Sequence, residues 1–148
     1  MSNFDFDIRT QFTFQTGYGK LNSVLKGLTD EGININGYFQ TIANRKTNFV
    51  RMVVGTSEDE DLQELKKVKK ILRKYAVKFQ EKQVIQVQDL PAGIPGQISA
   101  IYGALWSKLQ VNAIYLGEDN NLYLDTSHIG QTIKILSRID IPDSTENS

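Results

Sequence analysis

The sequence has no cysteine, a single histidine and only three prolines among its 148 residues. Without cysteine it has no disulfide framework, no thiolate metal site and no cysteine nucleophile. The one histidine leaves no second imidazole for a histidine-based metal site. No apolar stretch approaches the roughly 18 residues that a membrane-spanning helix needs. These absences exclude disulfide-stabilised domains, thiolate and histidine-based metal sites, and a cysteine nucleophile.

Charge of one sign is also lacking, because 17 Lys and Arg balance 17 Asp and Glu. The chain therefore has no bulk attraction for nucleic acid or anionic lipid. Residues 1–10 carry acids before any apolar run, which is not the pattern of a signal peptide. Hydrophobic residues make up 40% of the chain, enough to exclude a mostly disordered protein. We expect a soluble cytoplasmic protein with one ordinary domain or two small ones.

The first half of the chain reads as a β-α-β-β-α-β unit. Apolar and polar residues alternate over residues 3–15, which predicts a strand with one buried face. The period then becomes helical, and Gly32 stands where a left-handed C-cap is expected. The expected elements are a strand over 3–15, a helix through Leu21, Val24 and Leu28, strands over 33–43 and 49–54, a helix over about 60–75 and a strand over 77–81.

The second half repeats this order but lacks a clear final strand, unless Ile139–Ile141 supplies one. Thr126 or Ser127 is the expected N-cap of its last helix. The expected elements are a strand over 84–87, a loop over 89–96, a helix through Ile98–Leu109, strands over 111–117 and 121–125, and a helix over about 127–137. The sequence thus predicts domains over 1–82 and 83–141, with a disordered tail over 142–148.

Two motifs recur in these halves. The first half has Gly17-Tyr18-Gly19-Lys20-Leu21 after a strand and Gly32-Ile33-Asn34-Ile35 after the helix; the second has Pro95-Gly96-Gln97-Ile98 and Val111-Asn112-Ala113. The pattern resembles the ACT family of regulatory domains, with a strand, a Pro-Gly turn, a helix and then Gly-Ile-Asn-Ile. Tyr18 stands where the family usually has Pro, and Gln110 where it has Gly. The resemblance implies two ferredoxin-like α/β (α+β) sandwich domains in tandem, the second shortened, as in stand-alone tandem ACT proteins without a catalytic domain.

The motifs also suit a ligand on physical grounds. Glycine permits tight turns and leaves amides at a helix N-terminus uncovered, which favours a carboxylate or another small anion. An asparagine side chain both donates and accepts hydrogen bonds, as an amino acid requires. In ACT domains that bind amino acids, the turn and this asparagine line a site at an interface between two domains. The resemblance therefore implies these ligand-binding residues: Thr16, Gly17, Tyr18, Gly19, Asn34, Gly93, Ile94, Pro95, Gly96 and Asn112.

Simpler interpretations stand beside these. The glycines can be turns only, and Asn34 and Asn112 can satisfy neighbouring backbone groups. His128 is expected at the surface or at an N-cap, and the acidic run 58–61 at a solvated helix start. A basic helix face is expected to be solvated, with RNA binding as the alternative, although residues 48–53 lack the RNA-recognition signature. This face contains Lys66, Lys67, Lys69, Lys70, Arg73 and Lys74, continued by Lys78 and Lys82.

No acid–base pair or nucleophile stands out, so we expect no enzyme, no cofactor and no metal. The function that these features favour is a non-catalytic regulatory or sensor protein that binds an amino acid at a domain interface, as a homodimer and with a possible protein partner. The alternative is an assembly module that uses the same sheets for protein interaction and binds nothing small.

Overall fold

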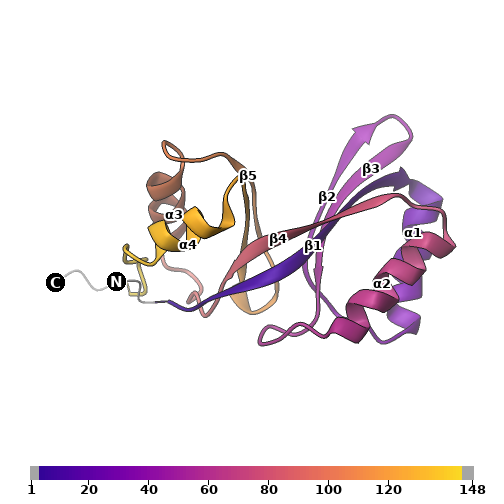
Figure 1. The fold of residues 1–148 in the computed structure, drawn as a ribbon, viewed down its shortest axis with the longest axis horizontal. Coiled ribbons are helices and arrows are strands. Elements are labelled where there is room, and N and C mark those ends of the chain that lie inside the picture. The colour runs from indigo at the N-terminus through magenta and orange to yellow at the C-terminus, as the bar shows by residue number, and fades with distance from the viewer. Residues whose placement is uncertain (1–3, 145–148) are drawn as a thin grey trace. The chain divides into compact units, whose positions relative to one another are not determined.

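The computed structural model describes residues 4–144, which fall into two compact units (Figure 1). We call residues 10–82 the insert unit, and residues 4–9 together with 83–144 the split unit. These boundaries differ from the expected 1–82 and 83–141, because the start of the chain groups with its C-terminal part. The physical reason is that the first strand continues without a break from one unit into the other. Each unit is described by itself below.

The insert unit has the expected β-α-β-β-α-β order, in which β2 pairs with β3 and β3 with β1, both antiparallel. Its strand order is β2-β3-β1-β4. The elements are β1 (Phe6–Gly17, from Thr10 on), α1 (Tyr18–Asp30), β2 (Ile35–Asn44), β3 (Thr47–Val54), α2 (Leu62–Lys74) and β4 (Phe79–Val87, up to Lys82).

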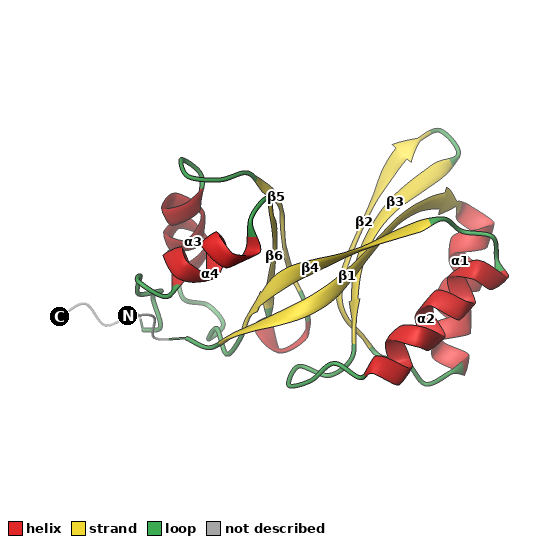
Figure 2. Cartoon of the chain, in the orientation of Figure 1, coloured by secondary structure: helices red, strands yellow, loops and turns green. Residues whose placement is uncertain are grey.

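Helices α1 and α2 cover one face of this sheet (Figure 2). The alternation expected in β1 is present, since Phe12 and Phe14 are buried against both helices. Gly32 follows α1 with a φ of +69°, so the expected left-handed C-cap is confirmed. Ile33 then donates its N–H to the oxygen of Leu28 at 2.9 Å, which closes the end of the helix.

The split unit repeats this architecture around a second core, built from strands β4 and β6 and helices α3 and α4. Its strand order is β1-β4-β6-β5, with β4–β6 and β6–β5 antiparallel. The elements are β1 up to Arg9, β4 from Gln83, α3 (Gln97–Leu105), β5 (Val111–Leu116), the 3-10 turn Glu118–Asn120, β6 (Leu122–Thr126) and α4 (Ile129–Leu136).

The split unit has four strands although the sequence analysis expected a shortened second domain. The beginning of β1 takes the place of the missing last strand, and the N–H of Gln88 donates to the oxygen of Asp5 at 3.0 Å just beyond it. Ile139 and Ile141 form no strand and instead pack against the core. Strands β1 and β4 thus exchange roles, because each is the first strand of one unit and the last strand of the other.

Three local expectations need correction. Residues 79–87 form one strand, not two, because no turn residue interrupts them. The N-cap of α4 is His128, not Thr126 or Ser127. The tail was expected to begin at Pro142, yet the oxygen of Pro142 accepts a hydrogen bond from Nε2 of Gln97 at 3.2 Å. Residues 145–148 of that tail lie outside the described residues.

Candidate functional site

The turn between β1 and α1 is the first predicted ligand loop. Thr16 and Gly17 end β1, and Tyr18 and Gly19 begin α1. Gly17 is the N-cap, with a φ of −68° that any residue adopts, and no side chain caps the helix. A Cβ atom built on Gly19 would have nothing within 4 Å. A side chain at Gly19 would therefore meet no neighbour, whereas a Cβ atom on Gly17 would lie 3.6 Å from the oxygen of Lys46. The positive end of the helix dipole lies at this turn.

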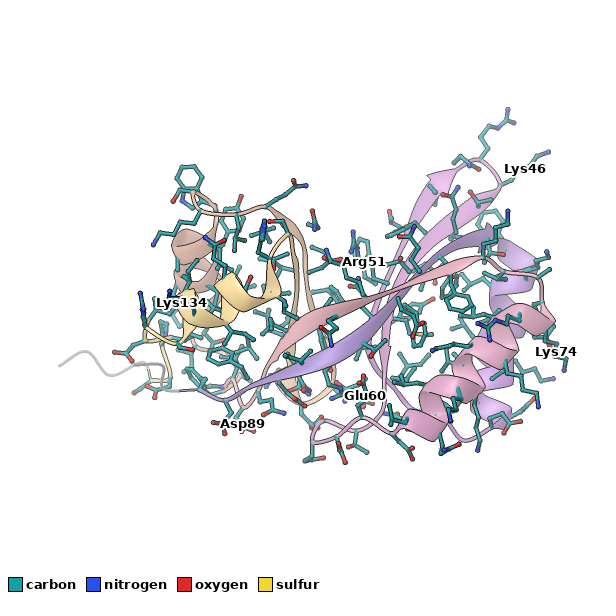
Figure 3. All side chains as sticks on the ribbon, viewed as in Figure 1. Lys46, Arg51, Glu60, Lys74, Asp89 and Lys134 are labelled. Atoms are coloured by element: carbon teal, nitrogen blue, oxygen red, sulfur yellow. The ribbon has the colours of Figure 1, made fainter. Side chains whose placement is uncertain are left out.

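The β2–β3 hairpin lies beside this turn. Gly17 pairs with Thr47 across β1 and β3, and the hydroxyl of Tyr18 donates to the oxygen of Arg45 at 3.4 Å. Lys46 projects from the tip of the hairpin (Figure 3). Cationic side chains in the loop next to α1 would favour an anionic group there.

Asn48 is a feature of this end that the sequence analysis missed. It pairs with Thr16 and, by strand alternation, faces the same helix-covered side as Val50 and Met52. Its side chain is only 3% exposed. Within residues 4–144, Nδ2 of Asn48 has no hydrogen-bond partner. A buried donor left unsatisfied costs roughly 1–3 kcal/mol, and the sequence analysis gave Asn48 no role of its own.

Asn34 lies at the other end of the insert unit. The side-chain Nδ2 of Asn34 donates to the backbone oxygen of Gly55 at 3.0 Å, and the backbone oxygen of Asn34 accepts the N–H of Gly55 at 2.9 Å. Gly17 pairs with Thr47 at the start of β3, whereas Ile35, next to Asn34, pairs with Val54 at its end. Gly17 and Asn34 are therefore roughly 23 Å apart along the strand direction. The structure does not bring the turn and this asparagine together within one unit.

The second predicted loop joins β4 to α3 and contains Gly93, Ile94, Pro95 and Gly96. Gly93 and Gly96 have φ values of +76° and +92°, which glycine adopts without strain. Gly96 is the N-cap of α3, again without a side-chain cap. Gln97 holds the loop in place, because its Nε2 donates to the oxygen of Pro91 at 3.0 Å and to the oxygen of Pro142 at 3.2 Å.

Asn112 is separated from that loop as Asn34 is from the first. The loop follows Val87, which pairs with Leu122 at the start of β6. Asn112 lies near the start of β5, where Val111 pairs with Thr126 at the end of β6. Its side chain has partners within the unit: Nδ2 donates to Oδ1 of Asp125 at 3.3 Å, and Oδ1 accepts from Gln110 at 2.8 Å. In both units the turn and the asparagine lie at opposite ends.

A buried polar network on the split-unit sheet also went unpredicted. Ile85 and Val87 face the helices, so Gln86 between them faces the other side. Nη1 of Arg9 donates to Oε1 of Gln86 at 3.1 Å, and Nε2 of Gln86 donates to the hydroxyl of Tyr123 at 3.3 Å. Burial raises the pKa of Tyr123 to about 12, although the Arg9 charge opposes this shift. Alternating polarity alone predicts exposure for these positions.

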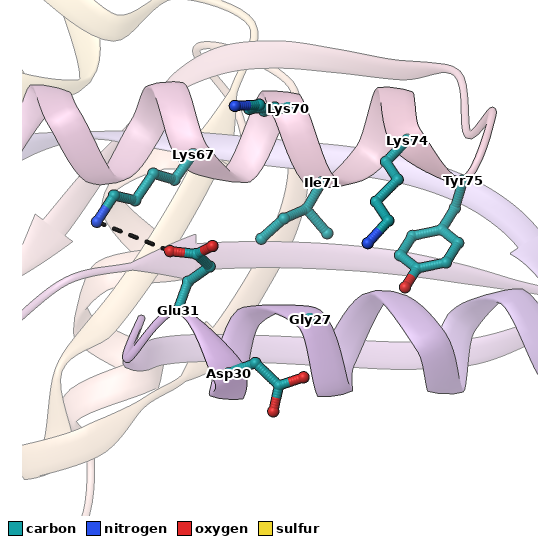
Figure 4. Close-up of a pocket in the computed structure, with 8 residues that line it drawn as sticks. All are labelled: Gly27, Asp30, Glu31, Lys67, Lys70, Ile71, Lys74 and Tyr75. Atoms are coloured by element: carbon teal, nitrogen blue, oxygen red, sulfur yellow. Dashed lines mark ion pairs between the residues drawn. The ribbon is translucent and has the colours of Figure 1, made fainter.

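A groove of about 330 Å³ runs between α1 and α2 (Figure 4). A Cβ atom on Gly27 would lie 3.2 Å from Cγ2 of Ile71, so the missing side chain lets the helices approach closely. Nζ of Lys67 lies 3.9 Å from Oε2 of Glu31 at one end. The lining residues are Gly27, Asp30, Glu31, Lys67, Lys70, Ile71, Lys74 and Tyr75. The groove contains part of the basic face but none of the residues predicted to bind ligand.

Metal ligands, the single histidine and membrane-spanning helices were the other features considered from the sequence. Within residues 4–144, no group of three or more His, Asp or Glu side chains is placed to hold a metal ion. His128 is exposed, and its Nδ1 lies 3.2 Å from the hydroxyl of Ser127, which agrees with the expected surface or N-cap position. No helix in this part of the chain is long and apolar enough to cross a membrane.

Solved structures of other proteins have a similar fold, although no relative is found from the sequence. No family model matches the sequence, and no curated protein does. Protein BT0572 from Bacteroides thetaiotaomicron has a TM-score of 0.70 at 20% identity, over 88% of this chain and 87% of that one. The ligand-free regulatory subunit of aspartate kinase from Thermus thermophilus has a TM-score of 0.61 at 11% identity, over 91% and 95%. E. coli aspartokinase III in complex with lysine and aspartate has a TM-score of 0.52 at 14% identity, over 91% and 31%.

At these identities the likeness shows the fold alone. The fold is ACT-like, as the sequence resemblance predicted, and similar structures include regulatory parts of aspartate kinases.

Proposed function

We propose that the protein is a non-catalytic regulatory module that binds an amino acid at an interface between two ACT-like domains. The observation that carries this proposal is the match to a separate regulatory subunit of an aspartate kinase, 95% of which is covered. A similar fold also occurs in an aspartokinase whose structure contains lysine and aspartate. Neither relative identifies the ligand of this chain.

The geometry supports an interface site. In each unit the glycine loop and the asparagine lie at opposite ends of the sheet, so one small ligand cannot touch both within that unit. Two domains that meet with the loop of one beside the asparagine of the other would complete the site. A homodimer offers such a meeting, and we propose it as the working form.

Each group has a task in this proposal. The open amides at the start of α1 bind the ligand carboxylate, favoured by the helix dipole. The Asn34 amide oxygen accepts from the ligand ammonium. A ligand with greater affinity for one domain arrangement shifts the population toward it and so changes the surface offered to a partner protein.

Thermal-shift measurements with each of the twenty amino acids test the proposal. A ligand present at 100 times its Kd stabilises the folded state by about 2.7 kcal/mol, which raises the Tm of a domain of this size by roughly 5–10 °C. Isothermal titration calorimetry then gives the stoichiometry of the active amino acid. If none of the twenty changes the Tm at millimolar concentration, the amino-acid proposal fails.

An assembly module without a small ligand is the second candidate. It is favoured by the side chains of Asn34 and Asn112, which already have partners inside their own units. Self-association or partner binding without any amino-acid effect would support it. RNA binding through the basic face is a third candidate, tested by a salt-dependent gel shift that is lost when Lys69, Lys70 and Arg73 are replaced.

A further inference from the structure

Helix α3 carries a stripe of apolar side chains that points away from the core of the split unit. Ile98, Tyr102 and Trp106 are 51%, 47% and 62% exposed. Their spacing of four places them on one ridge of the helix. The helix continues to Trp106, whose N–H donates to the oxygen of Tyr102 at 2.9 Å. Ile101 and Leu105, next to this ridge on the same broad stripe, are buried, so the apolar stripe of α3 extends beyond the part that the core covers.

The fold itself does not require this stripe. The corresponding helix of the insert unit, α1, also follows a glycine loop, and it exposes Lys20, Asn22 and Lys26. By contrast, residues 97–107 include no charged side chain at all. A neighbouring group of exposed aromatic and aliphatic residues is typical of an interaction surface.

We propose that α3 is a contact surface between two copies of this chain, related by a two-fold axis that passes beside Tyr102. Ile98 and Trp106 lie four residues before and after Tyr102. An antiparallel meeting of two α3 helices therefore places Trp106 of one copy opposite Ile98 of the other, a large side chain against a smaller one. The same patch then serves both copies, as a two-fold interface requires.

The lack of charge agrees with a second copy as the occupant. A patch without charged groups meets its own copy without electrostatic repulsion, whereas a basic or acidic partner would gain nothing from it.

The area defines the role of the stripe within the contact. Buried aromatic side chains each cover about 150–250 Å², so the exposed parts of Tyr102 and Trp106 contribute on the order of 200 Å². A stable dimer buries roughly 800 Å² on each partner. The stripe is thus the centre of a larger contact. Strand β5 follows α3 in the chain and ends the strand order; with the exposed Leu116 it offers further surface.

Trp106 is the only tryptophan, so its fluorescence reports on this surface alone. We expect its emission maximum to move to longer wavelength on dilution over ~three decades of concentration, in step with the loss of dimer measured by sedimentation velocity. Dissociation exposes the indole to water. A monomer at every concentration overturns the proposal, and so does a dimer whose dissociation leaves the emission unchanged, because its copies meet elsewhere.

A charge on the axis gives a second test. Tyr102→Glu places two like charges against each other and should weaken the dimer at least ~100-fold. Asn22→Glu on α1 is the matched control, since it makes the same charge change at an exposed position and should leave the dimer intact. Circular dichroism shows that both variants fold. Equal association of the two variants overturns the proposal.

The absence of native cysteine permits a third, direct test. A residue beside a two-fold axis meets its own copy, so Tyr102→Cys should form a disulfide-linked dimer under mild oxidation, for which the two Cα atoms must come within ~7 Å. Asn22→Cys should remain uncross-linked. A monomer at every concentration would also remove the homodimer that the proposed function uses, whereas a dimer that does not involve α3 overturns only this inference. The thermal-shift result with amino acids is independent of both outcomes.

Discussion

The guanidinium of Arg9 donates from Nη1 to Oε1 of Gln86 at 3.1 Å, and both side chains are fully buried. A buried charge is tolerated only with hydrogen-bond partners, because it has lost its water. Arg9 belongs to the short N-terminal segment that completes the split unit, and Gln86 belongs to β4 beside it. The bond therefore links the first residues of the chain to a strand almost eighty positions later.

Gln86→Leu should destabilise the split unit by about 2–3 kcal/mol, because it removes a hydrogen-bond partner from a buried charge. Urea unfolding followed by circular dichroism measures the change. Gln131→Leu, at an exposed position of α4, is the matched control and should stay within about 0.5 kcal/mol of the parent. Equal effects of the two substitutions would show that the Arg9–Gln86 bond contributes little to stability.

Tyr123 should make the protein lose stability at high pH. Its pKa is raised from the ordinary value near 10 to about 12 in the folded state, chiefly by burial. The contribution is fully present below pH 10 and is lost as the pH rises toward 12, since the unfolded state releases its proton first. The loss amounts to about 2–3 kcal/mol over this range.

Urea unfolding of the parent and of Tyr123→Phe at about pH 9 and about pH 11 isolates this contribution, since the other tyrosines are common to both proteins. We expect the parent to lose more stability than the variant between the two pH values. Parallel losses would show that the phenol titrates normally.

Asn48→Val should stabilise the insert unit by about 1 kcal/mol. The substitution removes a buried nitrogen without a partner in residues 4–144 and introduces a β-branched side chain suited to a strand. Thr16→Val at the paired position is the control for simple hydrophobic gain. Thermal unfolding compares the two variants, and a destabilised Asn48→Val would mean that the amide has a stabilising role.

Alanine substitutions at two glycines of the insert unit should change its stability in opposite directions. Gly32→Ala should destabilise by about 1 kcal/mol, because a φ of +69° strains any side chain. Gly19→Ala should stabilise by about 0.5 kcal/mol, because Gly19 lies within α1 with open space at its Cβ position. Urea denaturation of both variants checks the pair, and a loss of stability in Gly19→Ala would contradict the structure of this turn.

The sequence predicted those parts of the fold that depend on neighbouring residues. The alternation of Phe12 and Phe14, the helical spacing of Leu21, Val24 and Leu28, and the cap at Gly32 are all local patterns, and the structure contains each of them. The β-α-β-β-α-β order of the insert unit followed from these patterns directly.

What the sequence did not predict depends on contacts between distant positions. Nothing near Arg9 shows that residues 4–9 complete a unit whose other strands begin at Gln83. Arg9 and Gln86 look like the solvated face of half-buried strands, since alternation is the same whether the polar face meets water or a buried network. Both glycine turns lie before a helix, as the local pattern predicts, but their separation from Asn34 and Asn112 is a property of the sheet register.

Gly19→Asp should abolish amino-acid binding without harming the fold, if the α1 amides hold the ligand carboxylate. Space is available at its Cβ position, and a carboxylate in the first turn stabilises a helix by about 0.3–1 kcal/mol. The new side chain would occupy the positive helix end and repel the ligand. We therefore expect an equal or higher Tm without ligand and no further increase when the active amino acid is added.

Gly19→Asn is the matched control, because it has nearly the same shape without the charge and should retain part of the ligand-induced Tm increase. Titration calorimetry of the three proteins separates binding from stability. A full response in Gly19→Asp would place the carboxylate elsewhere and leave the α3 loop, whose N-cap Gly96 also lacks a side-chain cap, as the site to examine. The result thus assigns the ligand to one of the two glycine turns, both of which begin a helix without a side-chain cap.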